Sequence, residues 1–324
     1  MEVDRGTISV HHAFARAPGF DNAVTLAYAT VGAPQYDAQG AVTNAVLLLH
    51  GTTGSGDQFL TGDTAIFERG GAFDHDEVYS IIPDALGHGR SSKASDGLGA
   101  QFPSYGYRDL VALQRRVLDH LYVQRPLAVV GTSMGGMHAW LWACEPNAAD
   151  LCVAIACEPS PIIGRNLLWR RIIVDALADG ARLRHVMPIF EIVSRGVGTL
   201  ARDLPDRSSA EALVQRRWAA ADREHEIDVM LEFDASFDYE PNLENLSVPV
   251  VAIAFGSDEV NPVSLSASKK VAEERPESVH YVLVADDEQS DGHQTLRQTN
   301  RWGPIVRQHL MPLHVIRRTG SSGS

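Results

Sequence analysis

The sequence predicts an α/β fold, in which a mostly parallel sheet of about eight strands has helices on both faces and a helical cap is inserted after the sixth strand. Short runs rich in β-branched residues alternate with amphipathic stretches. Several of these runs are apolar throughout, which is typical of strands buried on both faces. The alternation stops in the middle of the chain, where helical patterns continue without a buried strand.

The chain contains eight segments that are expected to be strands. Residues 7–12 and 24–31 have the length and branching of strands, and the first is expected at an exposed antiparallel edge. The apolar runs without alternation predict fully buried strands at 45–49, 78–82, 127–130, 152–156 and 249–255. The last strand is expected at 280–284. Residues 107–122 place leucine and valine on one face of a helix, so a helix is expected to connect two parallel strands there.

The interruption of this pattern defines the expected domains. Strand and helix cease to alternate after Cys157 and resume at Val248. We therefore predict two parts of one core with a cap between them and a flexible tail at the end: core 1–157, helical cap 158–246, core 247–318 and tail 319–324.

Composition and charge limit the classes of partner. Of 324 residues, 44% are hydrophobic and 21% charged, as in ordinary globular proteins. The net charge of −13 disfavours nucleic acid and anionic membrane surfaces as partners. Because no apolar run reaches about 18 residues and no signal-peptide core is present, we expect a cytoplasmic protein. The three cysteines lack metal-ligand spacing, so no metal is expected there. We also predict no cofactor.

The strongest functional signal is Gly131-Thr132-Ser133-Met134-Gly135, directly after a buried strand and before a helix. It matches the pattern G-x-S-x-G, in which small residues let strand and helix approach a strained turn. An ordinary glycine-rich turn is the alternative. The context favours Ser133 as the nucleophile, with the backbone N–H of Met134 at the helix start as an oxyanion donor.

A second oxyanion donor is expected from the loop after the third strand, residues 50–54. Its glycines allow backbone N–H groups to converge on one oxygen, and the N–H of Thr52 is the candidate. His50 is expected to hydrogen-bond the backbone of this loop, and His88 and His138 are also expected to be structural.

A serine hydroxyl requires a base, and the base requires a group that fixes its tautomer. Asp258 follows the strand at 249–255 and is the favoured acid. Glu259 is the nearest alternative, and Glu158 after the preceding strand is another. His293 lies in the loop between the last strand and the terminal helix, which is the position expected for the base.

With these residues in place, the chain resembles the α/β-hydrolase superfamily, and within it the homoserine O-acetyltransferase branch. The similarity extends over most of residues 20–311 and is densest around Ser133. It is strongest in three stretches: FPSYGYRDLVALQRRVLDHLYV from Phe102, GTSMGGMHAWLWACEP from Gly131, and LEFDASFDYEPNLENLSVPVVAIAFGSDEVNP from Leu231. The resemblance implies a triad and an oxyanion hole, made by Ser133, Asp258 and His293 and by Thr52 and Met134. It also implies a possible homodimer through the cap.

Two departures from that branch bear on function. Homoserine transferases follow the histidine with Asp-Ala-Phe, whose aspartate contacts the amino group of homoserine, whereas His293 is followed by Gln294-Thr295-Leu296. The stretch PDALGHGRSS from Pro83 replaces a Gly-Ser-Thr-Gly-Pro signature and is similar to esterases and C–C hydrolases.

These departures favour hydrolysis over acyl transfer, and the presence of all three triad residue types disfavours an inactive protein. We predict a serine hydrolase that cleaves a carboxylic ester of a small molecule through an acyl-enzyme on Ser133. The alternative is an acyl-CoA-dependent O-acyltransferase of the homoserine type. A catalytically inactive binding module on the same fold is the third hypothesis.

Overall fold

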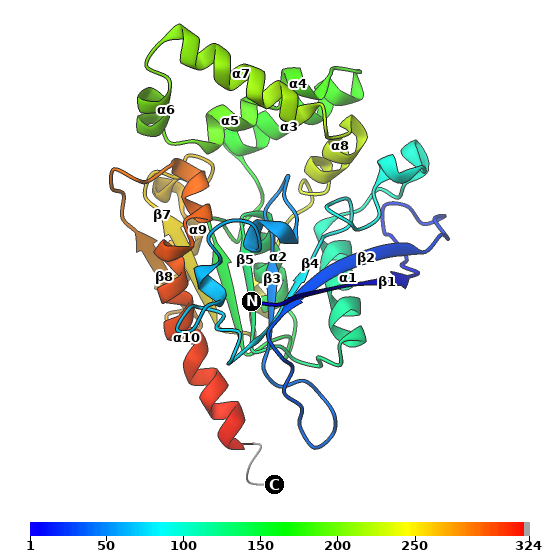
Figure 1. Ribbon diagram of the computed structural model, residues 1–324, viewed down its shortest axis with the longest axis vertical. Coiled ribbons are helices and arrows are strands. Elements are labelled where there is room, and N and C mark those ends of the chain that lie inside the picture. Colours follow the sequence, from blue (N-terminus) through cyan, green and yellow to red (C-terminus); the bar gives the residue numbers. More distant parts are fainter. Residues whose placement is uncertain (321–324) are drawn as a thin grey trace.

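A computed structural model describes residues 1–320 and has the predicted α/β architecture (Figure 1). Within these residues, eight strands form one sheet in the order β1-β2-β4-β3-β5-β6-β7-β8. β2 pairs antiparallel with both β1 and β4, and the other neighbours are parallel. The strands are β1 (Val3–Val10), β2 (Val24–Val31), β3 (Ala45–Leu49), β4 (Tyr79–Pro83), β5 (Ala128–Thr132), β6 (Leu151–Ile155), β7 (Val250–Phe255) and β8 (Val279–Val284).

The first strand differs from the prediction of residues 7–12. β1 begins at Val3 and ends at Val10, because it pairs along its whole length with the eight residues of β2. The predicted position at an antiparallel edge of the sheet is confirmed.

The helices of the described chain cover the sheet and form the cap. They are α1 (Tyr107–His120), α2 (Met134–Ala143), α3 (Gly164–Ala178), α4 (Leu183–Val186), α5 (Pro188–Ser194), α6 (Val197–Asp203), α7 (Arg207–Ala221), α8 (Glu226–Asp234), α9 (Ala267–Glu274) and α10 (Thr299–Gly320). α10 ends at Gly320, so residues 321–324 of the predicted tail lie outside the described residues.

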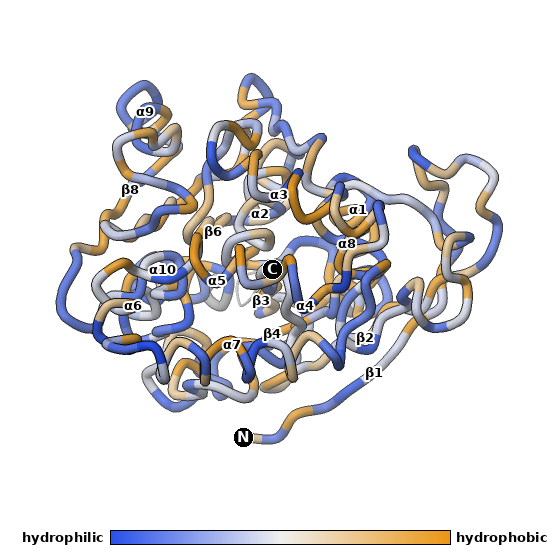
Figure 2. Tube along the Cα trace, turned by 90° about the horizontal axis from the view of Figure 1, so that it is seen from above, coloured by the Kyte–Doolittle hydropathy of each residue, from blue (hydrophilic) through white to orange (hydrophobic). Residues whose placement is uncertain are grey.

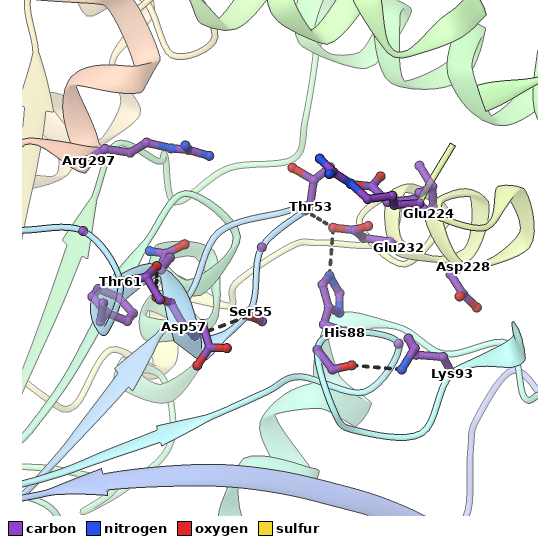
Figure 3. A pocket seen from close by; sticks show the side chains of 18 of the residues that line it. Thr53, Ser55, Asp57, Thr61, His88, Lys93, Glu224, Asp228, Glu232 and Arg297 are labelled. Atoms are coloured by element: carbon purple, nitrogen blue, oxygen red, sulfur yellow. Dashed lines mark hydrogen bonds and ion pairs between the residues drawn. The ribbon is translucent and has the colours of Figure 1, made fainter. Parts of the chain in front are cut away.

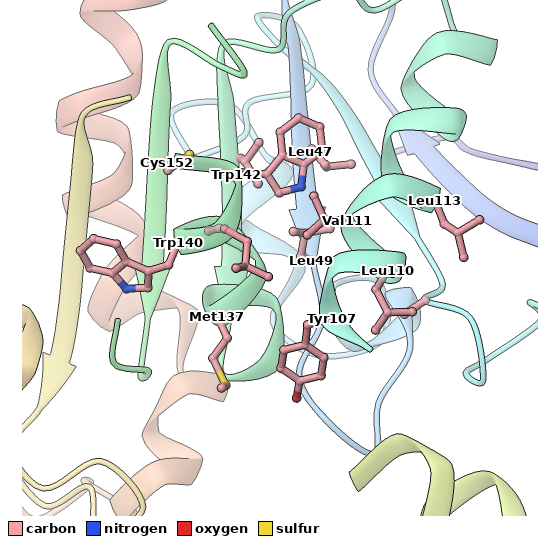
Figure 4. Packing of buried hydrophobic residues seen from close by; sticks show 14 of the residues in the cluster. Leu47, Leu49, Tyr107, Leu110, Val111, Leu113, Met137, Trp140, Trp142 and Cys152 are labelled. Carbon is pink, nitrogen blue, oxygen red and sulfur yellow. The ribbon is translucent and has the colours of Figure 1, made fainter. Parts of the chain in front are cut away.

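The sheet separates two hydrophobic clusters, which explains the apolar runs without alternation. On β3, Leu47 and Leu49 face the cluster that α1 and α2 cover, where Trp142 also packs (Figure 4). Val46 and Leu48 face the opposite cluster, under α10. Each fully buried side chain of this size stabilises the fold by about 2 kcal/mol, and both faces of the strand contribute.

Helices α3 to α8 lie together beyond the carboxyl ends of the parallel strands (Figure 1). Seen from above, they overlie the sheet (Figure 2). They have a hydrophobic cluster of their own, which includes Trp169 of α3 and Phe233 of α8. We call this group of helices the cap. Exposed apolar side chains lie along α3. The homodimer through the cap stays a prediction.

Among residues 1–320, no helix is both long and apolar enough to cross a bilayer. The three cysteines are free thiols, and burial raises the pKa of Cys144 to about 11. This environment makes them apolar packing groups rather than nucleophiles.

Candidate active site

Ser133 lies on the sharp turn between β5 and α2. Its φ of 51° and ψ of −112° are a conformation that L-residues other than glycine rarely adopt. A Cβ atom on Gly131 would lie 2.0 Å from the carbonyl oxygen of Gly135, and one on Gly135 would lie 2.2 Å from that of Leu49. The two glycines therefore bring strand and helix close enough to form the turn.

Gly135→Ala is expected to lower the free energy of unfolding by more than about 2 kcal/mol, because the added methyl group overlaps backbone atoms that cannot move aside. Urea denaturation followed by circular dichroism measures the change. Gly19→Ala is the matched control, since nothing lies within 4 Å of its added carbon. Equal midpoints for the two variants would contradict the close packing of the turn.

The structure brings Ser133, His293 and Asp258 together. His293 Nε2 lies 2.9 Å from Ser133 Oγ, and His293 Nδ1 lies 2.7 Å from Asp258 Oδ2. The other carboxylate oxygen of Asp258 accepts the backbone N–H groups of Val260 at 2.8 Å and Asn261 at 3.0 Å. An ionised Asp258 accepts a hydrogen bond from Nδ1–H, which leaves Nε2 without a proton and able to accept the proton of the Ser133 hydroxyl.

The two alternative acids lie elsewhere. Glu259 forms an exposed ion pair with Arg165 of the cap. Glu158 accepts the backbone N–H of Ser268 at 2.7 Å at the start of α9, and burial raises its pKa. Within the described chain, Asp258 is the one of the three predicted acids that contacts His293.

The loop after β3 lies directly against Ser133. A Cβ atom on Gly51 would be 3.5 Å from Ser133 Cβ, and the carbonyl oxygen of His50 accepts the N–H of Gly135 at 3.0 Å. Thr52 follows Gly51, and Met134 begins α2 immediately after Ser133. Their assignment as oxyanion donors stays a prediction, and their places in the chain put them on two backbone segments that meet at Ser133.

Two histidines that were expected to have structural roles, His50 and His138, form hydrogen bonds with nearby protein groups. His50 Nδ1 donates to the carbonyl of Gly51 at 2.9 Å, and its Nε2 accepts the N–H of Ala85 at 3.0 Å. Burial, and secondarily the nearby His88, lowers the pKa of His50 to about 4, so it is neutral. Burial also lowers the pKa of His138 to about 3, and this histidine pairs with Gln114 in the core.

Sequence reasoning missed three residues around the site. Gln58 accepts the N–H of Gly51 at 3.0 Å, Arg195 of the cap donates to Asp291 at 2.7 Å, and Glu232 of α8 pairs with His88. Glu232 is the one with a local signal, a carboxylate within the apolar stretch VMLEF. The Arg195 contact joins residues 96 positions apart, which no local pattern reveals.

A cavity of about 910 Å³ lies between the cap and the core (Figure 3). Thr53, in the loop beside Ser133, and Leu296, three residues after His293, line it. A second cavity of about 490 Å³ is lined partly by the same Thr53, together with Gln294. These volumes are in the range of small-molecule sites. Among residues 1–320, no group of three His, Cys, Asp or Glu side chains could hold a metal ion.

Known proteins resemble the chain in sequence and in fold. A model described as the alpha/beta hydrolase family matches residues 46–298. A probable acyltransferase of Methanothermobacter thermautotrophicus is 38% identical over 131 residues, which are 40% of this chain and 40% of that protein. The homoserine O-acetyltransferase of Pasteurella multocida is 30% identical over 171 residues, 47% of this chain and 46% of that protein. The matched region spans less than half the length of either relative.

Solved structures agree on the architecture. An acetylester hydrolase from Corynebacterium glutamicum superimposes with a TM-score of 0.77 at 16% identity, covering 96% of each chain. At such identity the match shows the fold alone.

Proposed function

The chain belongs to the alpha/beta hydrolase family, and from this membership we propose that it is a serine hydrolase that cleaves a carboxylic ester of a small molecule. One observation carries the proposal: the continuous contact from Ser133 Oγ through the His293 ring to the buried carboxylate of Asp258. A hydroxyl, an imidazole and a carboxylate in this order are the groups that activate a serine for attack on an acyl carbonyl.

The proposed mechanism uses these groups in turn. His293 Nε2 takes the proton of Ser133 while Oγ attacks the ester carbonyl carbon, and the Asp258 carboxylate stabilises the resulting imidazolium. The negative oxygen of the tetrahedral intermediate accepts the N–H groups of Met134 and Thr52. His293 then protonates the leaving alcohol, and the acyl-enzyme forms. Water, deprotonated by His293, then attacks the acyl carbon; the bond to Ser133 Oγ breaks, His293 returns the proton to Oγ, and the acid is released.

An acyl-CoA-dependent O-acyltransferase is the second candidate, favoured by the names of the curated relatives. It would use the same serine, histidine and aspartate, with an acceptor hydroxyl in place of water. Gln294 argues against the homoserine reaction, because a neutral amide stands where the resembling transferases have the aspartate that contacts the amino group. An inactive binding module is less supported, because the three polar side chains are aligned for proton transfer.

A panel of esters and thioesters of graded acyl length, assayed with and without an alcohol acceptor, tests the proposal. We expect release of free acid from at least one ester, and no O-acetylhomoserine from acetyl-CoA and homoserine. Chromatography coupled to mass spectrometry distinguishes the acid from the transfer product. Transfer that exceeds hydrolysis would support the second candidate instead, and no turnover of any member would support the binding module.

A further inference from the structure

Glu232 is a carboxylate buried where the cap meets two loops of the core. It lies on α8, and its side chain is 5% exposed. Its Oε1 atom lies 2.8 Å from Nε2 of His88, in the loop after β4, and also accepts the backbone N–H of Thr53, in the loop after β3 (Figure 3). A single carboxylate oxygen thus joins three segments that are distant in the sequence.

The charge of Glu232 favours the protonated form of His88. Burial alone would lower the pKa of His88, but the charge of Glu232 and the contact between the two side chains outweigh burial and raise that pKa. A buried carboxylate costs several kcal/mol unless a charge and hydrogen bonds compensate it. His88 and the Thr53 amide provide this compensation.

The backbone at Thr53 is strained, and the strain needs a restraint. Thr53 has a φ of 59°, in the left-handed region that a β-branched residue rarely adopts. Such a conformation persists only where surrounding contacts hold it. The carboxylate of Glu232 is the charged side chain that accepts the amide hydrogen at this position.

The restraint acts on the peptide next to a predicted oxyanion donor. The Thr53 N–H belongs to the planar Thr52–Thr53 peptide, so fixing its direction fixes the orientation of Thr52 on that side. On the other side, the N–H of Gly51 donates to Gln58 Oε1 at 3.0 Å. The Thr52 N–H therefore lies between two amides that side chains hold in place.

We propose that Glu232 is a positioning residue: it holds the Thr52 N–H in the direction that the oxyanion requires, and thereby makes transition-state stabilisation depend on a helix of the cap. The inference rests on the proposed ester hydrolysis. Glu232 acts through Thr53 and His88 rather than on the substrate, so its effect is expected in kcat rather than in KM.

The experiment separates positioning from simple attachment of the cap. Asp234 is on the same helix and pairs with Arg16 of the core at 3.1 Å, in a cap–core contact that does not involve the loop after β3. Asp234→Asn is therefore the matched control. Glu232→Ala and Glu232→Gln are compared with it and with the unmodified chain, using kcat, KM and the inhibition constant of a trifluoromethyl ketone. This inhibitor adds to serine and forms an oxyanion, so its binding reports the oxyanion site.

Glu232→Ala is expected to lower kcat about a hundredfold with KM little changed, the loss typical of a misplaced oxyanion donor. The ketone should bind more weakly by a similar factor. Glu232→Gln retains an oxygen acceptor but not the charge, so about a tenfold loss is expected. Asp234→Asn should retain the kcat and the ketone affinity of the unmodified chain.

Several outcomes would overturn the inference. The first is that Glu232→Ala has the same kcat and ketone affinity as Asp234→Asn. The second is that Glu232→Ala changes KM but not kcat. If the alanine variant does not fold, as judged by circular dichroism, an unchanged kcat in Glu232→Gln would overturn it. Failure of the proposed function is distinct, because the unmodified chain would then hydrolyse no ester.

Discussion

Ser133→Ala is expected to lower ester turnover at least about a thousandfold while the protein remains folded. The hydroxyl that is lost is the group 2.9 Å from His293 Nε2, and no bond to the acyl carbon forms without it. Alanine retains the Cβ atom, so the strained turn keeps its packing. Turnover of the best ester from the panel measures the effect, and thermal denaturation monitors the fold.

A fluorophosphonate probe gives an independent check on this variant. It should label the unmodified chain at one position and fail to label Ser133→Ala, because the probe reacts with the activated serine. Intact-protein mass spectrometry measures the labelling. Retained turnover in a folded Ser133→Ala protein would remove this serine from the mechanism.

Asp258→Asn is expected to reduce kcat by about ten thousandfold, because it imposes the wrong histidine tautomer. Two backbone N–H groups, from Val260 and Asn261, donate to Oδ1 of this side chain. In the asparagine variant these donors still require an oxygen, so the amide NH₂ faces His293 Nδ1. The imidazole then carries its proton on Nε2 and cannot accept the proton of Ser133.

Glu259→Gln is the control for this prediction, since Glu259 is the adjacent carboxylate and pairs with Arg165 at the surface. Steady-state kinetics of the two variants on the same ester should give a near-native kcat for Glu259→Gln. Equal losses in both variants would contradict the assignment of Asp258 as the acid beside the histidine.

The fold could be predicted because the information for it is local. Strands buried on both faces must be apolar at consecutive positions, and β3 places Leu47 and Leu49 on one face and Val46 and Leu48 on the other. The turn at Ser133 is also local, since its glycines are fixed by contacts within a few residues and with one neighbouring strand. The start of β1 was predicted wrongly, because the extent of an edge strand depends on its partner β2.

The sequence left three candidates for the triad acid, and there is a physical reason why it could not decide among them. Asp258 and Glu259 are adjacent, and the direction of the loop after β7 decides which of them meets His293. That direction depends on the N–H groups that close the turn onto Asp258 Oδ1. Glu232 and Thr53 are 179 residues apart, so their contact exists only once the cap has packed on the core.

The cap is joined to both of the loops that flank Ser133. Glu232 contacts the loop after β3, and Arg195 donates to Asp291, two residues before His293. If the cap moved as a lid, these contacts would have to break, or the two loops would have to move with the cap. We therefore expect the cap to stay in place during turnover, so that substrate enters and product leaves through an opening that is always present.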